Sequence, residues 1–140
     1  MRKLTISPRM GEASVQMLEE LVGEKFSENF REFLKENSGL SHYENVFIDK
    51  AGTCWQIQQY NMFKDLYGLT EEFLKTYKRK LIPFAYDPGG WHFCLCFDPG
   101  DDYGAIIVNR WTDHLPEEQF LKIADNFEHF IDNLKREGEV

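Results

Sequence analysis

The amino-acid sequence predicts an α+β fold: a single domain with an antiparallel sheet of about five strands, helices packed mainly on one face, and a C-terminal helix. Three observations predict it. Apolar residues recur at helical spacing near both ends of the chain. The region between them alternates apolar and polar residues, as strands do. Two Asp-Pro-Gly sequences, at 87–89 and 98–100, mark turns within that region.

The first part of the chain is expected to form two short helices. Residues 13–22 carry apolar side chains at helical spacing until Gly23 interrupts the pattern. The next segment, "FSENFREFLKENSG", has a single apolar stripe made of Phe26, Phe30, Phe33 and Leu34. Asn37 and Gly39 both suit the left-handed turn that ends a helix, so we expect the second helix to stop there.

Two strands and a third helix should follow. "YENVFID" and "TCWQIQQYN" have the composition of strands, and the residues 50–52 between them suit a hairpin turn. In the second strand Trp55 and Ile57 point to one face, while the neighbouring glutamines point to the other. This alternation predicts a sheet with one covered and one partly wet face. Thr70 suits the N-cap of the third helix, whose inward residues would be Phe73, Leu74 and Tyr77.

The two Asp-Pro-Gly sequences are expected to be turns on either side of a central strand. Asp suits the first position of a β-turn, Pro fixes φ at the second, and Gly tolerates the positive φ of the third, which predicts type II turns. Between the turns, "WHFCLCF" alternates large apolar residues with others. The segment "GAIIVNRW" after the second turn is rich in β-branched residues. We therefore expect an antiparallel meander of strands at 81–86, 91–98 and 104–111.

The last element is expected to be one long helix. Pro116 fits the first helical position, and Glu117 and Glu118 fit the positive end of the helix dipole. An apolar stripe then continues at helical spacing. Its members are Phe120, Ile123, Ala124, Phe127, Phe130, Ile131 and Leu134.

Length and composition favour one domain over 1–140, with its core at about 13–136 and frayed ends. The chain has 140 residues, 15% of them aromatic, which can supply a sizeable core. It has three cysteines, no secretory signal and no apolar run long enough for a membrane span. These features predict a cytoplasmic protein with reduced thiols. A net charge of −8 argues against nucleic-acid binding, which needs clustered Lys and Arg.

No catalytic residue, metal or cofactor is expected. His92, Cys94 and Cys96 resemble a ligand set, but on an extended strand the outer two lie about 13 Å apart, too far to share one zinc ion. We expect the cysteines to be small core residues instead. No local motif supports Cys–His catalysis, and "DPGDD" does not fit the spacing of an EF-hand. The 24 acidic residues make carboxylate pairs inevitable by chance.

The remaining candidate is a protein-binding surface near both ends of the meander. Aromatic side chains and carboxylates gather at its corners, and Trp and Tyr often dominate the energy of an interface. The candidate residues are Asp87, Trp91, Asp98, Asp101, Asp102, Tyr103, Trp111 and Asp113. Two alternatives stay open: Trp91 can pack in the core beside Phe93, and Trp111 can lie in the core or at the surface.

Four ordered segments make the chain similar to the SUKH superfamily, which includes Smi/Knr-type regulators of fungal cell-wall synthesis and many bacterial proteins. The segments are "FREFLKENSG", "LIPFAYDPGGWHFCLCF", "GAIIVNRW" and "FEHFIDNL". The first resembles the family's helix with its glycine turn, and the second resembles its proline, glycine turn and following strand. The resemblance covers about residues 15–134. Two local departures are Lys25-Phe26, where the family often has Leu-Pro, and Ser38-Gly39, where it has two glycines.

This resemblance implies a non-catalytic immunity protein, because bacterial members of the family commonly bind and neutralise toxins. The expected partner is a protein, in particular a basic toxin domain, to which an acidic inhibitor can mimic phosphate. Neither nucleic acid nor membrane is expected as a partner. Two alternatives stay open: a regulatory or scaffold module in cell-wall synthesis or signalling, and an enzyme of unknown type.

Overall fold

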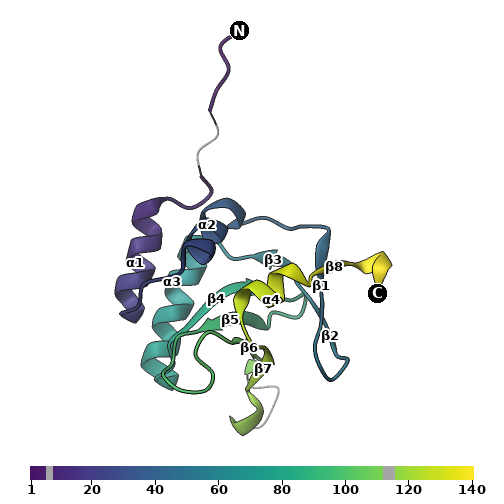
Figure 1. Ribbon diagram of the computed structural model, residues 1–140. Coiled ribbons are helices and arrows are strands. Elements are labelled where there is room, and N and C mark those ends of the chain that lie inside the picture. The colour runs from purple at the N-terminus through teal and green to yellow at the C-terminus, as the bar shows by residue number, and fades with distance from the viewer. Residues whose placement is uncertain (6–7, 112–115) are drawn as a thin grey trace.

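Two antiparallel sheets organise the chain, and helices flank the larger one (Figure 1). The computed structural model describes residues 1–5, 8–111 and 116–140. The helices are α1 (Glu12–Val22), α2 (Glu28–Asn37), α3 (Phe63–Glu72) with its π-helical extension η1 (Phe73–Tyr77), and α4 (Phe127–Asp132). The strands are β1 (Glu44–Ile48), β2 (Cys54–Gln56), β3 (Gln59–Tyr60), β4 (Leu81–Tyr86), β5 (His92–Cys96), β6 (Ile106–Asn109), β7 (Phe120–Ala124) and β8 (Lys135–Arg136).

The larger sheet has the strand order β3-β4-β5-β6-β7, with every neighbouring pair antiparallel. Its centre is the predicted meander, since β4, β5 and β6 pair consecutively. Successive side chains of β5 point to opposite faces. Phe93 and Leu95 therefore belong to the main core, while Cys94 and Cys96 belong to a smaller cluster.

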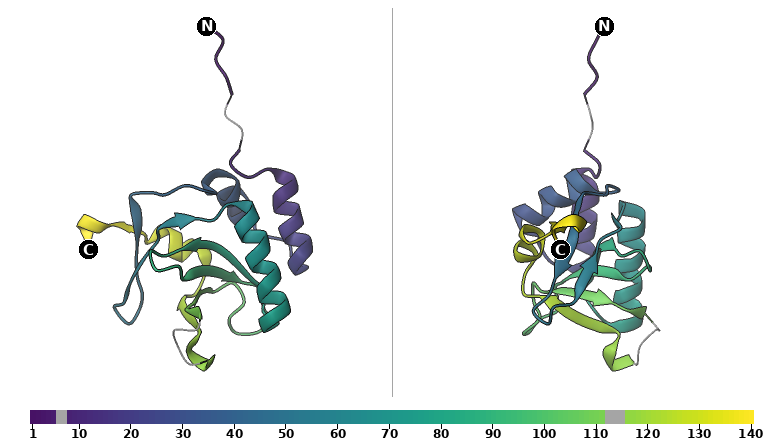
Figure 2. Two further views of the ribbon diagram at one scale, coloured as in Figure 1. Left: turned by 180° about the vertical axis from the view of Figure 1, so that it is seen from behind. Right: turned by 90° about the vertical axis from the view of Figure 1, so that its right-hand side faces the viewer.

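The main core lies on the face of the sheet that α2 and α4 cover. The ring of Phe84 in β4 lies 6.3 Å from that of Phe30 and 5.4 Å from that of Phe127, measured between centroids. α1 packs against α2 and α3 and contributes Val15, Leu18 and Val22 to the same core. The smaller cluster forms where Phe73 of η1 packs with Cys94. Figure 2 shows α3 on one side of the sheet and α2 and α4 on the other. The expected placement of helices mainly on one face is confirmed, with α3 opposite.

The first two predicted helices are confirmed, and their ends follow local rules. α1 ends at Gly23, which takes the left-handed φ of 71° and donates its N–H to the Glu19 carbonyl at 2.9 Å. α2 begins after Ser27, whose hydroxyl oxygen accepts the Phe30 N–H at 3.2 Å. Gly39, with a φ of 80°, follows α2 as expected.

The prediction that Thr70 begins the third helix is wrong. α3 starts at Phe63, and Thr70 is fully buried within it. The Thr70 hydroxyl donates to the Leu66 carbonyl at 2.7 Å, one turn earlier. A threonine inside a helix can satisfy its hydroxyl in this way at a slight cost in helix stability, so the helix continues through Thr70. The inward position of Phe73 is confirmed, because this side chain is fully buried in η1.

The single long helix predicted at the C-terminal end is also wrong. The segment instead forms a short 3-10 turn (Pro116–Glu118), then β7, and then the six-residue α4. β7 satisfies the backbone groups of β6, with Leu121 opposite Val108. Asn126 begins α4, since its side chain accepts the His129 N–H at 2.7 Å. Apolar residues that fit one helical stripe therefore serve a strand and a helix in turn.

The Asp-Pro-Gly turns are placed as predicted, but only the second has its positive φ at the predicted glycine. Gly100 has a φ of 117°. In the first turn the positive φ, 92°, falls on Gly90 rather than on Gly89. The Gly90 N–H donates to the Asp87 carbonyl at 3.0 Å. This is the pattern of a tight turn followed by a left-handed glycine, and not of a type II turn.

The smaller sheet has the order β2-β1-β8. The predicted strand at 53–61 is divided between the two sheets, because the chain changes partner within it. Ile57 donates its N–H to the Asn45 carbonyl at 2.7 Å, and the next residue, Gln58, donates to the Tyr86 carbonyl at 2.8 Å. Trp55 and Ile57 are buried and Gln56 is exposed, as the alternation predicted.

Both ends of the chain make specific contacts. The sequence predicted no helix or strand for these segments. Met10 is buried, and the Arg9 side chain donates to the Ser38 carbonyl at 2.8 Å. At the other end, β8 pairs antiparallel with β1. The carboxylate of Glu137 accepts a hydrogen bond from the Gln56 side chain at 2.7 Å. The small sheet therefore joins the middle of the chain to its last residues.

Candidate functional site

The structure separates the predicted surface residues into two groups at opposite ends of β5. One group lies at the β4–β5 corner and contains Asp87, Trp91 and Trp111. The other lies at the β5–β6 corner and contains Asp98, Asp101, Asp102 and Tyr103. Trp91 and Asp98 are seven residues apart in sequence, which is about 23 Å along an extended strand, so the groups do not form one patch. Asp113 lies outside the described residues.

The group at the β4–β5 corner is used to build the fold. The Asp87 carboxylate accepts the N–H groups of Gly89 at 2.9 Å and of Trp91 at 2.8 Å, which fixes the turn. The Trp91 side chain is half-buried and packs against the main core. Packing in the core was one of the two alternatives predicted for this residue. Trp111 is half-buried beside the smaller cluster and donates its indole N–H to the Gly90 carbonyl at 2.8 Å.

Asp98 also has a structural task. Its carboxylate accepts hydrogen bonds from the Arg79 side chain and, at 2.7 Å, from the Lys80 N–H. These bonds tie the segment after η1 to the start of the β5–β6 loop. The Arg79 guanidinium in turn lies 5.0 Å above the Phe120 ring. Asp98 is therefore bound to neighbours within the chain.

Asp101, Asp102 and Tyr103 form the exposed part of the predicted site. The Tyr103 side chain is 50% exposed, and its ring centroid lies 5.9 Å from that of Phe97, which anchors the loop to the core. The Tyr103 hydroxyl donates to the Glu24 carboxylate at 3.4 Å. Partial desolvation and the nearby Glu24 charge raise the pKa of this hydroxyl. The contact joins the β5–β6 loop to the end of α1.

Glu24 belongs to a groove of about 800 Å³ between α1 and α2. Glutamates outnumber cations on its walls by five to two. The glutamates are Glu12, Glu19, Glu20, Glu24 and Glu28, and the cations are Lys25 and Arg31. A groove of this size and charge can accept basic side chains of a partner.

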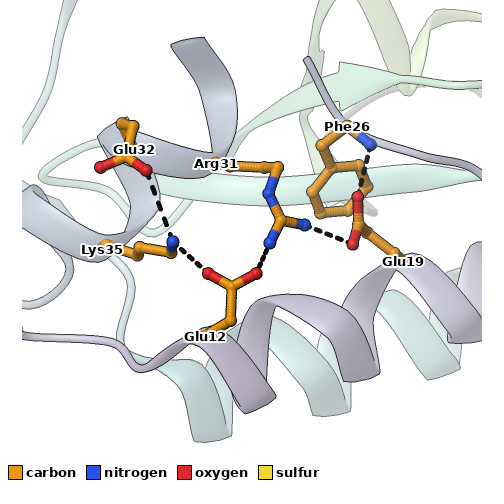
Figure 3. Close-up of polar contacts among 6 residues, drawn as sticks. All are labelled: Glu12, Glu19, Phe26, Arg31, Glu32 and Lys35. Carbon is orange, nitrogen blue, oxygen red and sulfur yellow. Dashed lines mark hydrogen bonds and ion pairs between the residues drawn. The ribbon is translucent and has the colours of Figure 1, made fainter. Parts of the chain in front are cut away.

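Part of this charge is neutralised at the bottom of the groove. Arg31 of α2 lies between two carboxylates of α1 and forms ion pairs with Glu12 and Glu19 (Figure 3). Glu12 also pairs with Lys35. The second oxygen of Glu19 accepts the Phe26 N–H at 2.8 Å. The network locks the two helices together, so these residues serve the fold.

The Tyr103–Glu24 hydrogen bond links the remaining glutamates of the groove to the β5–β6 loop, and we call this set of residues the acidic rim. Its members are Glu20, Glu24 and Glu28 at the groove, and Asp101, Asp102 and Tyr103 in the adjoining loop. Asp102 also pairs with Lys122 of β7 at 3.9 Å. The sequence analysis named the loop residues and did not name the three glutamates. The available signal was the recurrence of glutamates between residues 12 and 28.

His92, Cys94 and Cys96 are placed among core residues. Both cysteines are fully buried, as predicted for small core residues, and burial raises the pKa of each thiol. The half-buried His92 ring receives a hydrogen bond from the Asn61 side-chain amide at 3.2 Å. Burial lowers the His92 pKa, against smaller opposing effects of Asp65 and of the Asp87 charge. Among the described residues, no cluster of three or more His, Cys, Asp or Glu side chains could hold a metal.

Within residues 1–5, 8–111 and 116–140, the helices are too short or too polar to cross a membrane.

Comparison with known protein families gives one finding. Residues 12–131 match the family described as "SUKH_6: SMI1-KNR4 cell-wall". No curated protein matches the sequence. The matched range runs from the first residue of α1 into α4, so it includes the groove and the meander.

Proposed function

The chain belongs to the SUKH_6 family, described as SMI1-KNR4 cell-wall, and from this membership we propose that it is a non-catalytic protein-binding domain of the immunity type. In this role it binds a cognate toxin in the cytoplasm and blocks its activity. The proposal rests on what members of the family commonly do, together with the surface of this chain.

The observation that carries the proposal is the acidic rim. Glu24, one of the groove carboxylates, accepts a hydrogen bond from Tyr103, an aromatic side chain that is half exposed and packed on Phe97. Interfaces that bind tightly often combine such an aromatic anchor with charges complementary to the partner. A net charge of −8 extends the attraction over a longer range and favours fast association with a basic domain.

The rim predicts the partner's chemistry. A domain that binds nucleic acid presents clustered Lys and Arg to phosphates. The rim offers carboxylates to the same side chains, so a toxin held there could not bind its nucleic-acid substrate at the same time. Binding should weaken as ionic strength rises, because exposed charges are screened beyond about 8 Å at physiological salt.

The proposal can be tested with matched charge reversals. The probe is the purified toxin domain encoded beside this chain's gene, and the readouts are its Kd for the chain and protection of growth on co-expression. We expect Asp101→Lys with Asp102→Lys to weaken binding by at least about tenfold. Glu117→Lys with Glu118→Lys is the control, because it changes net charge equally beside Arg110, at the other end of β6. Equal losses in both variants would assign the effect to overall charge and remove the rim from the proposal.

A second candidate is a regulatory or scaffold role in cell-wall synthesis, which the family description favours by naming the cell wall. The two roles differ in the partner. Affinity purification of the tagged chain from its source cell should recover a basic toxin domain if the immunity proposal is right. Recovery of wall-synthesis proteins in a rim-dependent manner would establish the second role instead.

A further inference from the structure

The larger sheet ends in a strand whose outer edge has no neighbour among the described residues. β7 is the last strand in the order of this sheet and pairs with β6. We propose that β7 takes up a short extended segment of another protein as an added strand, with apolar side chains of the segment at alternate positions. Extended peptides bind open edges in this way, because the edge supplies main-chain hydrogen bonds. The inference does not depend on the acidic rim.

The register of β6 and β7 identifies which backbone groups are available. The Arg110 N–H donates to the Gln119 carbonyl at 2.7 Å, so the alternation of an antiparallel pair directs Gln119 and Leu121 toward β6. Phe120 and Lys122 alternate with these residues, so their N–H and C=O groups point to the open edge. Two residues spaced in this way offer an added strand two N–H and two C=O groups to pair with.

A groove already exists beside this edge. It has a volume of about 400 Å³ and lies between β7 and the tip of the β1–β2 hairpin at 49–53. The hairpin tip is held rigidly by Asp49, whose carboxylate accepts the N–H groups of Ala51 and Thr53, both at 2.9 Å. The other carboxylate oxygen accepts the Trp55 indole N–H at 2.9 Å. The wall opposite β7 is thus pre-formed, which reduces the entropy lost on binding.

The side chains that line the groove define the segment that fits. Leu121 and Ile123 lie on the same face of β7, and both contribute to the main core. Apolar side chains of an added strand would continue this surface toward Ala51. The charged residues of the lining balance, because two lysines, Lys50 and Lys122, stand with two aspartates, Asp49 and Asp125. Asp125 pairs with Lys50 at 3.0 Å and with Lys122 at 3.4 Å, and Lys122 also pairs with Asp102 of the rim at 3.9 Å. A neutral groove favours an uncharged, alternately apolar segment over the basic partner of the rim.

The geometry favours a single strand over a second copy of this chain. Pairing two β7 edges would bring a whole sheet beside β7, where the hairpin tip already stands across the groove. In addition, Ile123 is an extra residue in the ladder, because Lys122 pairs with Ile107 and Ala124 pairs with Ile106. Such a bulge bends an edge strand and discourages long edge-to-edge pairing, while a short segment can still bind before it.

The test compares Lys122→Pro with Lys122→Thr. The Lys122 N–H points outward, so proline there removes a donor from the edge and leaves the bonds to β6 in place. Threonine removes the same lysine side chain but keeps the N–H. The probe is a peptide selected on the intact chain from a displayed library of segments roughly seven residues long. Its Kd is measured for all three proteins, and amide exchange locates it on the wild type.

We expect Lys122→Pro to weaken the peptide by at least about tenfold and Lys122→Thr by less than about threefold. Bound peptide should slow exchange of the Phe120 and Lys122 amides, which exchange faster than the Leu121 amide in the free chain. If Lys122→Pro does not fold, the exchange pattern on the wild type decides alone. Failure to select a peptide, binding that maps elsewhere, or equal affinity of both variants would overturn the proposal. A dimer of the free chain would also overturn the proposal if it persists in Lys122→Thr and is lost in Lys122→Pro. In that case the edge of β7 binds a second copy of the chain.

Discussion

Replacing Arg31 by methionine should destabilise the fold more than the removal of a surface charge would. Arg31 pairs with Glu19, and its own side chain is 16% exposed while that of Glu19 is 10% exposed. Methionine keeps most of the apolar length of arginine, so the change isolates the guanidinium. Without it, the Glu19 carboxylate stays largely buried with the Phe26 N–H as its remaining donor among the bonds described.

The magnitude follows from this burial. Breaking a fully buried ion pair by removing one partner costs about 3–5 kcal/mol, because a charge is left unpaired. The groove beside Glu19 admits water, so we expect about 2–3 kcal/mol. The pair with Glu12 adds little, since that carboxylate is 50% exposed. For a chain of this size the loss corresponds to a fall in Tm of roughly 6–9 °C.

Urea unfolding followed by circular dichroism measures this change as a shift in midpoint at constant slope. Glu19→Gln added to Arg31→Met should recover about half of the loss, because the amide oxygen still accepts the Phe26 N–H and no charge remains. Lys35→Met is the matched control: the ammonium of this lysine pairs with the half-exposed Glu12 and Glu32, and its loss should cost less than about 0.5 kcal/mol. If Arg31→Met costs no more than Lys35→Met, the argument from burial is refuted.

Three further predictions concern the core. The folded chain has a lowered His92 pKa, whereas the unfolded value is near 6.5, so unfolding takes up a proton below that pH. Stability should therefore be fully present above about pH 6.5 and fall as the pH drops below it, and His92→Gln should flatten a urea-midpoint profile in this range. Phe84→Ala should cost about 3–5 kcal/mol in the same assay, and a smaller loss would show that the core refills the space. A thiol reagent should modify the exposed Cys54 in the folded protein and the buried Cys94 and Cys96 only after unfolding; early labelling of either would contradict their burial.

The parts of the fold that sequence predicted correctly are those in which local and long-range preferences agree. α1 and α2 have both an apolar stripe and terminal residues that suit their ends, Gly23 and Ser27. The meander has turn residues at both corners and β-branched residues in its last strand. In the segment from 116 to 134, however, the apolar spacing fits a helix, and the deciding factor is the need of β6 for a partner. No local pattern contains that information.

The candidate site was only partly predictable for a related reason. The sequence identified Asp101, Asp102 and Tyr103 because exposed turn residues next to an aromatic are recognisable locally. It also selected Asp87 and Asp98, which the fold uses to hold a turn and an arginine. Whether a carboxylate is free depends on its neighbours in space. The adjacency of Glu24 to Tyr103 across 79 residues of chain can be seen only in the folded structure.

The pairing of β8 with β1 sets an order of events during synthesis. β1 and β2 leave the ribosome early, but Glu44 meets Arg136 only after 92 further residues have been made. Until then the outer side of β1 is an unpaired edge on a nascent chain, the kind of surface that chaperones cover. Contacts so distant in sequence also slow folding, because a long loop must close before they form. A chain truncated before residue 135 lacks β8, so the outer edge of β1 should remain unpaired permanently.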